Sequence, residues 1–305
     1  MSKTKWITAI VAVLLAAGAG TYYWLFMESG RPVEGAYTLD IEKFRTLAGE
    51  VDGPKPTAIQ VEKVGGFEFP GIGVVAGDSW ASRPIPVFSY RLIYPDHTAM
   101  IDSAMDAETA AEAGAVQFDE AAYDRMASAM ADAQFIVITH EHIDHIGGLV
   151  THPELPQILP ATRLTVEQIS NPDRMGPLRF PDGALEGYAA LDYQDYAPVA
   201  PGVVVVKSPG HSPGSQMVYV QLADGEEYLF LGDVAWVMRN VDLTRERARL
   251  MTWYFLREER QPVLDQLAGI KSFSESNPQV HLIPGHDGEA VDGLVSAGLL
   301  NPGFQ

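Results

Sequence analysis

A dense group of metal-binding residue types follows a short apolar stretch in the middle of the chain. Residues 135–138, Phe-Ile-Val-Ile, predict a buried strand that runs directly into His140-Glu141-His142-Ile143-Asp144-His145. Three of the eight histidines of the chain lie in this segment. A rigid strand that ends in such side chains directs them towards one cleft. The fold must therefore be one that presents side chains from strand ends.

Three other apolar stretches end in the same way. Residues 203–206 lead to Pro209-Gly210-His211, residues 280–283 lead to Pro284-Gly285-His286, and residues 228–231 end at Gly232-Asp233. A single histidine near a strand end is more often a hydrogen-bonded core or surface residue than a ligand. Repetition of this pattern disfavours that explanation here. His97, His152 and His281 lack the context, and we interpret them as structural or surface residues.

The chemistry of the group indicates a metal centre. Neutral imidazole and carboxylate are ordinary ligands for zinc and neighbouring transition metals. Five histidines and two aspartates are enough for two ions, with positions left for water and substrate. The alternating pair His140 and His142 can converge on one ion, and the adjacent pair Asp144 and His145 can face the other.

The remaining pattern mixes strands and helices in both halves of the chain. Alternation predicts a strand over 58–64, with further strands over 71–76, 87–94 and 98–101. Helices are predicted over 40–48, 119–131, 243–256 and 261–274. Such a mixture indicates sheets covered by helices.

The N-terminus predicts a membrane anchor over residues 1–27. Lys3 and Lys5 precede an uncharged apolar run from Trp6 to Met27, about 22 residues or roughly 33 Å of helix, which matches the hydrocarbon layer of a bilayer. Residues 6–27 are thus expected to contact lipid, with the N-terminus cytoplasmic and the catalytic domain periplasmic or extracellular. A cleaved signal peptide is the alternative, because Ala17-Gly18-Ala19 resembles a cleavage site.

Beyond the anchor, we expect a juxtamembrane linker over 28–57 and one domain over 58–305. The chain has 305 residues, of which 47% are hydrophobic, so a sizeable core is possible. Acidic residues outnumber basic ones by 40 to 21, and the net charge of −19 disfavours a nucleic-acid partner. The absence of cysteine excludes disulfides, zinc knuckles and thiol nucleophiles.

The motif His-x-His-x-Asp-His at 140–145 resembles the signature of the metallo-β-lactamase superfamily, and His211, Asp233 and His286 follow in the order of that family. The resemblance implies an α+β fold, a four-layer αββα sandwich. It implies two divalent metal ions, with Zn²⁺ expected. By the resemblance, one ion binds His140, His142 and His211, the other binds Asp144, His145 and His286, and Asp233 bridges both. Asp102 is similar to the aspartate that orients the ligand loop of the family.

Details of the motifs are similar to the lactonase and glyoxalase II branches. True β-lactamases of the family generally carry Cys or Ser at the position of Asp233. Acyl-homoserine lactonases usually place Tyr at the position of Trp236, and we interpret this tryptophan as a wall of the substrate pocket. The arginines that follow Asp233 have two interpretations, a site for an anionic substrate or a solvated helix face; they are Arg239, Arg245, Arg247 and Arg249.

The expected function is hydrolysis of a small-molecule ester or lactone by a binuclear metal centre. A water that bridges two divalent ions loses a proton near neutral pH, and the hydroxide can attack the carbonyl. Asp144 is the candidate catalytic residue that passes a proton to the leaving group. Two alternatives stay open: a phosphotriesterase or β-lactam hydrolase on the same centre, and a non-hydrolytic metal-binding or diiron redox protein. The diiron form usually has Glu at the position of His142.

Overall fold

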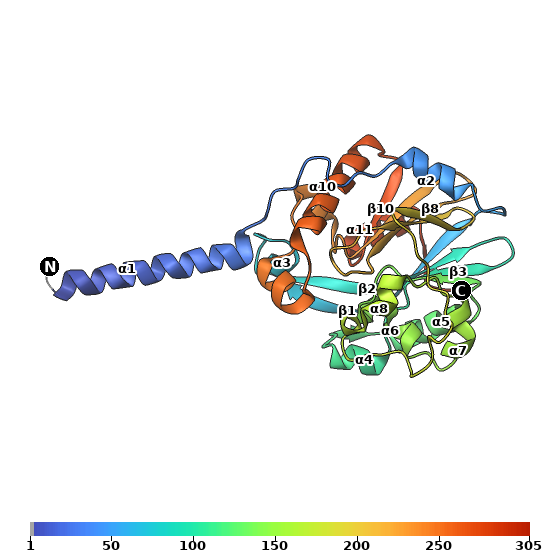
Figure 1. Cartoon of the computed structure of the whole chain (residues 1–305), viewed down its shortest axis with the longest axis horizontal. Helices are drawn as coiled ribbons and strands as arrows, with labels where there is room; N and C mark the ends of the chain where they lie inside the picture. The colour runs from blue at the N-terminus through green and yellow to red at the C-terminus, as the bar shows by residue number, and fades with distance from the viewer. Residues whose placement is uncertain (1–2) are drawn as a thin grey trace.

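Two mixed β-sheets lie face to face at the centre of the domain in the computed structural model, which describes residues 3–305 (Figure 1). The first sheet has the order β11-β1-β2-β3-β5, and β4 pairs with β1. The second sheet has the order β10-β9-β8-β7-β6. The strands of the first sheet are β1 (Ala58–Pro70), β2 (Ser82–Ile93), β3 (Thr98–Ile101), β4 (Gln117–Phe118), β5 (Phe135–Val137) and β11 (Asn301–Pro302). Those of the second are β6 (Tyr196–Ala200), β7 (Val203–Lys207), β8 (Gln216–Gln221), β9 (Glu227–Gly232) and β10 (Val280–Pro284).

Helices cover the outer face of each sheet. The first sheet packs its outer side chains, among them Met100 and Ile136, against α4 (Ala107–Glu112), α5 (Glu120–Ala131), α6 (Ile143–Val150), α7 (Leu155–Ile158) and α8 (Val166–Ser170). The second packs Val204, Val206 and Leu229 against α2 (Ile41–Ala48), α9 (Met238–Leu243) and α10 (Arg260–Ser276). Three further helical segments complete these layers: two short 3-10 helices, Leu159–Ala161 and Pro172–Met175, and helix α11 (Gly288–Ser296).

A third cluster of apolar side chains fills the space between the sheets. Leu92 and Ile101 of the first sheet and Val205, Val218 and Phe230 of the second are among its buried members. Burial of this apolar surface is the main force that holds the two sheets together. The predicted four-layer αββα sandwich is therefore confirmed, as is the predicted α+β class.

Parallel pairing brings the ends of distant strands to one edge of the sandwich. β3 and β5 run parallel and pair Ile101 with Val137, so residues 102 and 138–145 leave the sheet side by side. β9 and β10 also run parallel, and Gly232 pairs with Pro284. Since β7 runs in the same direction as β9, with β8 antiparallel to both, the segment after Lys207 leaves at this edge too.

Helix α1 (Lys3–Tyr22) continues into a π-helical turn, Tyr23–Met27, and projects away from the domain (Figure 1). Residues Lys3–Met27 are long and apolar enough to cross a bilayer, and none of the apolar window is buried inside the protein. A signal sequence would satisfy the same criteria.

The segment 28–57, expected to be a linker, instead contributes to the domain. Asp40 caps α2 by accepting hydrogen bonds from the backbone N–H groups of Glu42 and Lys43. Phe44 on this helix is fully buried, and its ring lies 5.1 Å from that of Tyr219 on β8. The helix predicted over 40–48 is present as α2, but its packing against the second sheet was not predicted, because the Gly and Pro residues around it resemble a linker.

Two further predicted elements differ from the structure. Residues 71–76 were expected to form a strand, but Gly71–Val74 form helix α3, because a short apolar run does not distinguish a buried helical turn from a strand. The helix predicted over 243–256 is also wrong. Helix α9 ends at Leu243, where Thr244 has a left-handed φ of 49°, and the chain becomes helical again only over 249–256, of which Met251–Leu256 form a π-helical turn.

Replacing Phe44 by Ala tests whether α2 belongs to the folded core. We expect Phe44→Ala to reduce the stability of the full chain in detergent by ~3–5 kcal/mol, because it leaves a cavity against the second sheet. Thermal unfolding followed by circular dichroism measures the change. Lys43→Ala, an exposed substitution on the same helix, should change stability by less than about 0.5 kcal/mol. Equal effects of the two substitutions would show that α2 only rests on the surface.

Candidate metal centre

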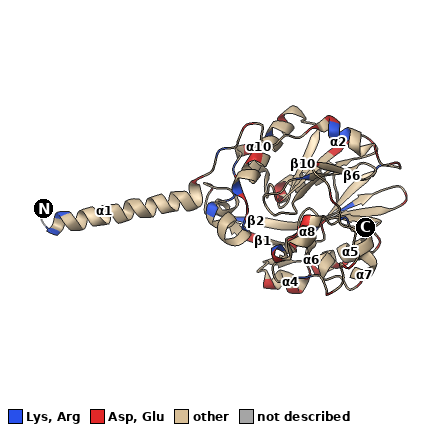
Figure 2. Cartoon of the chain, viewed as in Figure 1, with Lys and Arg blue, Asp and Glu red and all other residues tan. Residues whose placement is uncertain are grey.

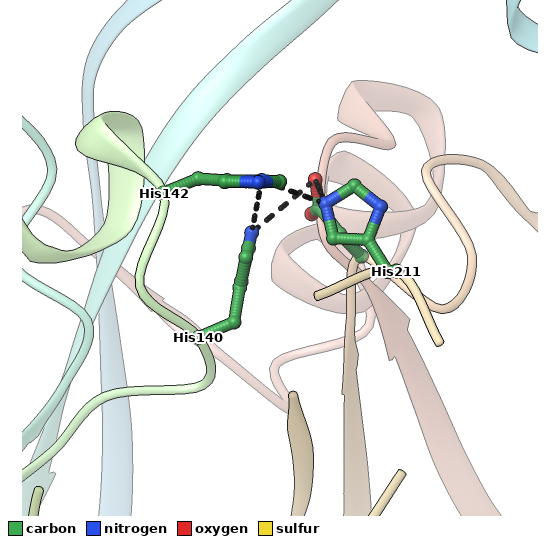
Figure 3. A group of neighbouring side chains, drawn as sticks. His140, His142 and His211 are labelled. Carbon is green, nitrogen blue, oxygen red and sulfur yellow. Dashed lines mark hydrogen bonds and ion pairs between the residues drawn. The ribbon is translucent and has the colours of Figure 1, made fainter. Parts of the chain in front are cut away.

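Four side chains from three strand ends form the first candidate half-site. His140 and His142 follow β5, His211 follows β7, and Asp233 follows β9. Figure 3 shows the three imidazoles pointing towards one another. His142 Nδ1 lies 3.1 Å from His140 Nε2 and 2.9 Å from His211 Nε2. Asp233 Oδ2 closes the group at 3.7 Å from His140 Nε2 and 3.2 Å from His211 Nε2.

The second candidate half-site consists of Asp144, His145 and His286. The Nε2 atoms of His145 and His286 are 3.4 Å apart. Asp144 Oδ2 lies 3.8 Å from the first and 3.5 Å from the second. Asp144 and His145 occupy the first turn of α6, and His286 follows β10, so this group also draws on both sheets.

Asp233 lies between the two half-sites and faces both. Its Oδ2 belongs to the first group, while its Oδ1 lies 3.3 Å from His145 Nε2 and 3.1 Å from His286 Nε2 in the second. Oδ1 is buried and has no hydrogen-bond donor among the described residues 3–305. A buried carboxylate oxygen without a donor costs free energy unless another charge compensates it. A cation shared between the groups would supply that charge.

The spacing of the donor atoms fits a tetrahedral ion. Metal–nitrogen bonds of 2.0–2.1 Å in a tetrahedron place neighbouring ligand atoms about 3.3 Å apart. Within each group, including the nearer oxygen of Asp233, the separations quoted above run from 2.9 to 3.8 Å. The seven residues therefore fit two divalent ions, with four donor atoms for each and one aspartate in common.

Buried acceptors fix the orientation of three of the imidazoles. The Nδ1 atom of His145 lies 2.8 Å from Asp102 Oδ2, that of His211 lies 2.8 Å from Glu258 Oε2, and that of His286 lies 2.8 Å from the carbonyl oxygen of Pro86. These oxygens only accept hydrogen bonds, so each ring donates from Nδ1 and turns the lone pair of Nε2 towards the centre. This is the arrangement that a metal-binding histidine requires.

Asp102 contacts the ligand loop at three atoms. Its carboxylate accepts hydrogen bonds from the backbone N–H of Thr139 at 2.7 Å and from the Thr139 hydroxyl at 2.8 Å, besides facing His145. The residue has a φ of 60°, in the left-handed region that few non-glycine residues adopt. The interactions of its side chain with the 139–145 loop compensate for that strain.

Glu258 was not identified from the sequence as part of the site, and Arg247 was considered only as a contact for an anionic substrate or as part of a solvated helix face. Both are buried, and the Arg247 Nε donates to Glu258 Oε2 at 2.9 Å. Arg247 Nη2 also donates to the backbone carbonyl of Asp233 at 2.7 Å. Arg247 is therefore neither a substrate contact nor part of a solvated face. No local pattern distinguishes it from its neighbours, because its partners lie elsewhere in the chain.

The other three arginines proposed for an anionic substrate also have structural partners. Arg239 pairs with Asp78, Arg245 donates to the carbonyl oxygen of Ala76, and Arg249 pairs with Glu28. The arginines that line the cavity beside the metal centre are instead Arg174 and Arg257.

Trp236 lines this cavity, as expected, and it also contacts the metal centre directly. Its indole N–H donates to Asp233 Oδ2 at 2.6 Å. Arg247 lies over the indole ring, with its guanidinium carbon 4.9 Å from the ring centroid. Trp236 thus holds the shared carboxylate from one side while Arg247 holds its backbone from another, a role that the sequence-based interpretation as a wall did not include.

Glu141, the variable position between the first two histidines, joins two ligand loops. Its buried carboxylate accepts hydrogen bonds from the Ser212 hydroxyl at 2.7 Å and from the backbone N–H of Gly214 at 3.1 Å. Burial raises the pKa of this carboxyl group, against the effect of the Ser212 hydrogen bond. The sequence analysis assigned it no role.

The glycine of the Pro284-Gly285-His286 turn is required by close packing. A Cβ atom at Gly285 would collide with Asp233 Oδ1 and would approach the carbonyl oxygen of Gly232 to 3.0 Å. Only glycine allows the β9 and β10 ends to approach this closely.

Burial and neighbouring charges shift the pKa values of the centre in different directions. Burial lowers the pKa of His140 and His142, and neighbouring imidazoles lower it further. Burial also opposes the charged form of His145, but the carboxylates of Asp233, Asp144 and Asp102 outweigh it and raise the pKa. Burial opposes ionisation of Asp233 too, yet the surrounding imidazoles hold its pKa well below the usual range. The group as a whole favours an ionised carboxylate at its centre.

A cavity of about 370 Å³ opens beside the two half-sites. His142, Asp144, Asp233 and His286 contribute to its floor, while its walls are mostly apolar: Phe67, Phe69, Ile85, Ile143, Trp236, Phe255 and Leu256. A few converging polar groups under an apolar wall are typical of a small-molecule site.

The three remaining histidines lie away from the centre, as expected. His97 stacks on Tyr94, His152 contacts the carbonyl oxygen of Ala127, and His281 pairs with Glu226.

A sequence model of the metallo-beta-lactamase superfamily matches residues 82–286, and the chain therefore belongs to this superfamily. The match contains all seven candidate ligands. No curated protein matches the chain in sequence.

Solved structures of the same fold include enzymes that act on lactones. An N-acyl homoserine lactone hydrolase with N-hexanoyl-L-homoserine bound at its catalytic metal centre has a TM-score of 0.60 and 16% identity, over 78% of this chain and 96% of that chain. A quorum-quenching N-acyl homoserine lactone lactonase has the same score and identity, over 77% and 94%. A probable metal-dependent hydrolase from Staphylococcus aureus has a TM-score of 0.56 and 11% identity, over 77% and 91%. At these identities the likeness shows the fold.

The geometry predicts that the purified full chain binds two divalent metal ions, because seven candidate ligands exceed the needs of one tetrahedral ion. Elemental analysis of metal-replete protein measures the ratio. Asp233→Ala should reduce retention of both ions during dialysis, whereas Asp224→Ala, at an aspartate outside the centre, should not. A wild-type ratio of one or less would contradict the binuclear arrangement.

Proposed function

We propose that the chain is a binuclear metal-dependent hydrolase that cleaves an ester or lactone bond of a small-molecule substrate, with Zn²⁺ as the metal. The observation that carries the proposal is the single aspartate, Asp233, between two groups of ligand-type side chains at the floor of an apolar cavity. Two enzymes of the same fold, an N-acyl homoserine lactone hydrolase and an N-acyl homoserine lactone lactonase, support this choice of substrate class.

Two divalent ions bound here would supply an activated water and would stabilise negative charge on the attacked oxygen. The protein itself fixes the orientation of the side chains that would bind these ions. Asp102 and Glu258 hold His145 and His211 in one tautomer, so their Nε2 lone pairs need no reorganisation. Trp236 holds Asp233 in place through the indole N–H.

Asp144 is our candidate for proton transfer to the leaving group. It lines the cavity, and its side chain is more accessible than those of His145 and His286 in the same half-site. A carboxylate at the border between the metal centre and the cavity can reach a departing oxygen. Arg257, which lines the same cavity, can bind a polar or anionic part of the substrate, whereas Arg174 donates to the carbonyl oxygens of Leu256 and Arg257.

Hydrolysis tests this proposal together with the role of Trp236. We expect the metal-loaded chain to hydrolyse lactones or p-nitrophenyl esters faster than phosphotriesters or a chromogenic cephalosporin. Trp236→Phe should lower kcat by about 10–100-fold, since loss of the N–H releases the shared carboxylate. Phe69→Leu, at a cavity wall without such a hydrogen bond, should change mainly KM.

Faster hydrolysis of the phosphotriester or the cephalosporin would contradict the proposed ester or lactone substrate. If Trp236→Phe shifts only KM, as Phe69→Leu does, the indole is merely a wall. Turnover of none of these substrates would favour a non-hydrolytic protein.

We further propose that residues 6–27 span a membrane, with the N-terminus cytoplasmic and the catalytic domain outside the cytoplasm. The support is the exposed apolar helix and the two lysines before it. The protein should stay in the membrane fraction after carbonate extraction, and a C-terminal alkaline phosphatase fusion should be active. A soluble mature form that begins near Gly20 would instead show that the segment is a cleaved signal peptide.

A further inference from the structure

All exposed aromatic side chains in residues 28–305 lie in two short segments. Trp80 is 56% exposed, and Trp253, Tyr254 and Phe255 are 68%, 74% and 65% exposed. The tyrosine and phenylalanine rings pack edge to face at 5.1 Å. Aromatic surface of this size in contact with water is unfavourable, and its concentration in one region indicates a contact surface.

Both segments lie against the end of helix α1. The Trp80 ring is 5.2 Å from that of Phe26, and its indole N–H donates to the Tyr22 hydroxyl at 2.9 Å. The Trp253 ring is 6.3 Å from that of Trp24. We call the group Trp80, Trp253, Tyr254 and Phe255 the aromatic face. Through Trp80 and Trp253 it contacts the last residues of the proposed membrane span.

Partly buried ion pairs and hydrogen bonds hold this junction. Glu246 is buried and accepts hydrogen bonds from the Ser29 hydroxyl at 2.6 Å and from the backbone N–H of Gly30 at 3.2 Å, besides pairing with Arg260. Arg260 also pairs with Glu28 at 3.2 Å. Helix α1 therefore leaves the domain in a fixed direction, and a bilayer around α1 would meet a fixed part of the domain surface.

Basic residues accompany the aromatic face. Arg249 lies over the Trp24 ring at 4.6 Å, and Arg257 shares a surface cavity with Trp24, Trp253 and Tyr254. Figure 2 shows Lys and Arg residues at the junction between α1 and the domain. The chain as a whole carries an excess of acidic residues. Trp, Tyr and Arg together are typical of the headgroup region of a bilayer, where anionic lipids attract the cations.

The aromatic face is continuous with the candidate active site. Phe255 belongs to this face and also lines the cavity beside the metal centre, together with Leu256 and Arg257. The next residue, Glu258, orients His211. One short segment thus runs from the surface beside α1 to a side chain that contacts a candidate metal ligand.

We propose that the aromatic face lies in the headgroup region of the bilayer, and that the active site takes amphiphilic esters or lactones with long acyl chains directly from it. The reactive carbonyl would sit over the two half-sites, while the acyl chain would pass Phe255 and Leu256 towards the lipid. This inference rests on the proposed hydrolase function and on the proposed membrane span.

The position of the aromatic face is testable without any substrate. The chain has no cysteine, so Tyr254→Cys introduces a single labelling site for an environment-sensitive fluorophore in the full chain reconstituted in vesicles. Nitroxide-bearing lipids should quench this label strongly, and aqueous iodide should quench it weakly. Lys43→Cys is the control, because it is exposed on α2, away from α1 in Figure 1, and should show the reverse pattern. Equal, water-like behaviour of both labels would overturn the proposed docking.

The substrate class requires a second measurement on the same vesicles. For a dodecanoyl lactone dissolved in the bilayer, the double variant Trp253→Ser, Tyr254→Ser should lose about tenfold or more in kcat/KM. For a soluble butanoyl lactone it should match wild type. Val166→Ser, at an exposed apolar residue of α8, should match wild type on both substrates.

Each failure has a distinct meaning. Equal loss on both lactones, or no loss on either, would overturn delivery from the bilayer while leaving the hydrolase function in place. If the wild type hydrolyses no ester or lactone, the hydrolase function fails and the proposed substrate falls with it, whatever the label shows.

Discussion

The carboxylate of Asp233, held between two groups of imidazoles, is the interaction on which the architecture of the site depends. One oxygen faces His140, His142 and His211, and the other faces His145 and His286. The ligand loops of both sheets converge on this carboxylate. Burying several imidazoles and carboxylates together costs free energy, and opposite charge at this point must offset that cost. The close approach of Gly285 and the hydrogen bond from Trp236 are consequences of placing this one side chain.

A layer of buried ionic groups behind the ligands extends this order to the rest of the domain. Asp102 connects the second half-site to the end of β3, and Glu258 connects the first to Arg247. The segment that carries Arg247 and Glu258 also carries Glu246, which fixes the start of the domain after α1. Residues 246–258 therefore contribute both to the contacts behind the candidate ligands and to the junction with α1, which explains why this stretch is not the regular helix that its sequence suggested.

The parts of this design that the sequence revealed are those with a local signature. The seven candidate ligands follow from apolar stretches that end in His or Asp, whereas the αββα layers and the part played by Asp102 were expectations from the resemblance to the superfamily. The roles of Arg247 and Glu258 were not predictable in the same way, because a charged residue becomes structural only when distant segments bury it. The same limit applies to α2, whose place in the core depends on Phe44 meeting the second sheet. Helical periodicity over 243–256 was likewise overridden by tertiary contacts of Glu246 and Arg247.

Anomalous diffraction from crystals of the metal-loaded chain tests the central claim most directly. A shared Asp233 predicts two peaks about 3.5–4 Å apart. One should lie among His140, His142 and His211, the other among Asp144, His145 and His286, each within bonding distance of a different oxygen of Asp233. A single peak, or two peaks of which only one contacts Asp233, would contradict the account.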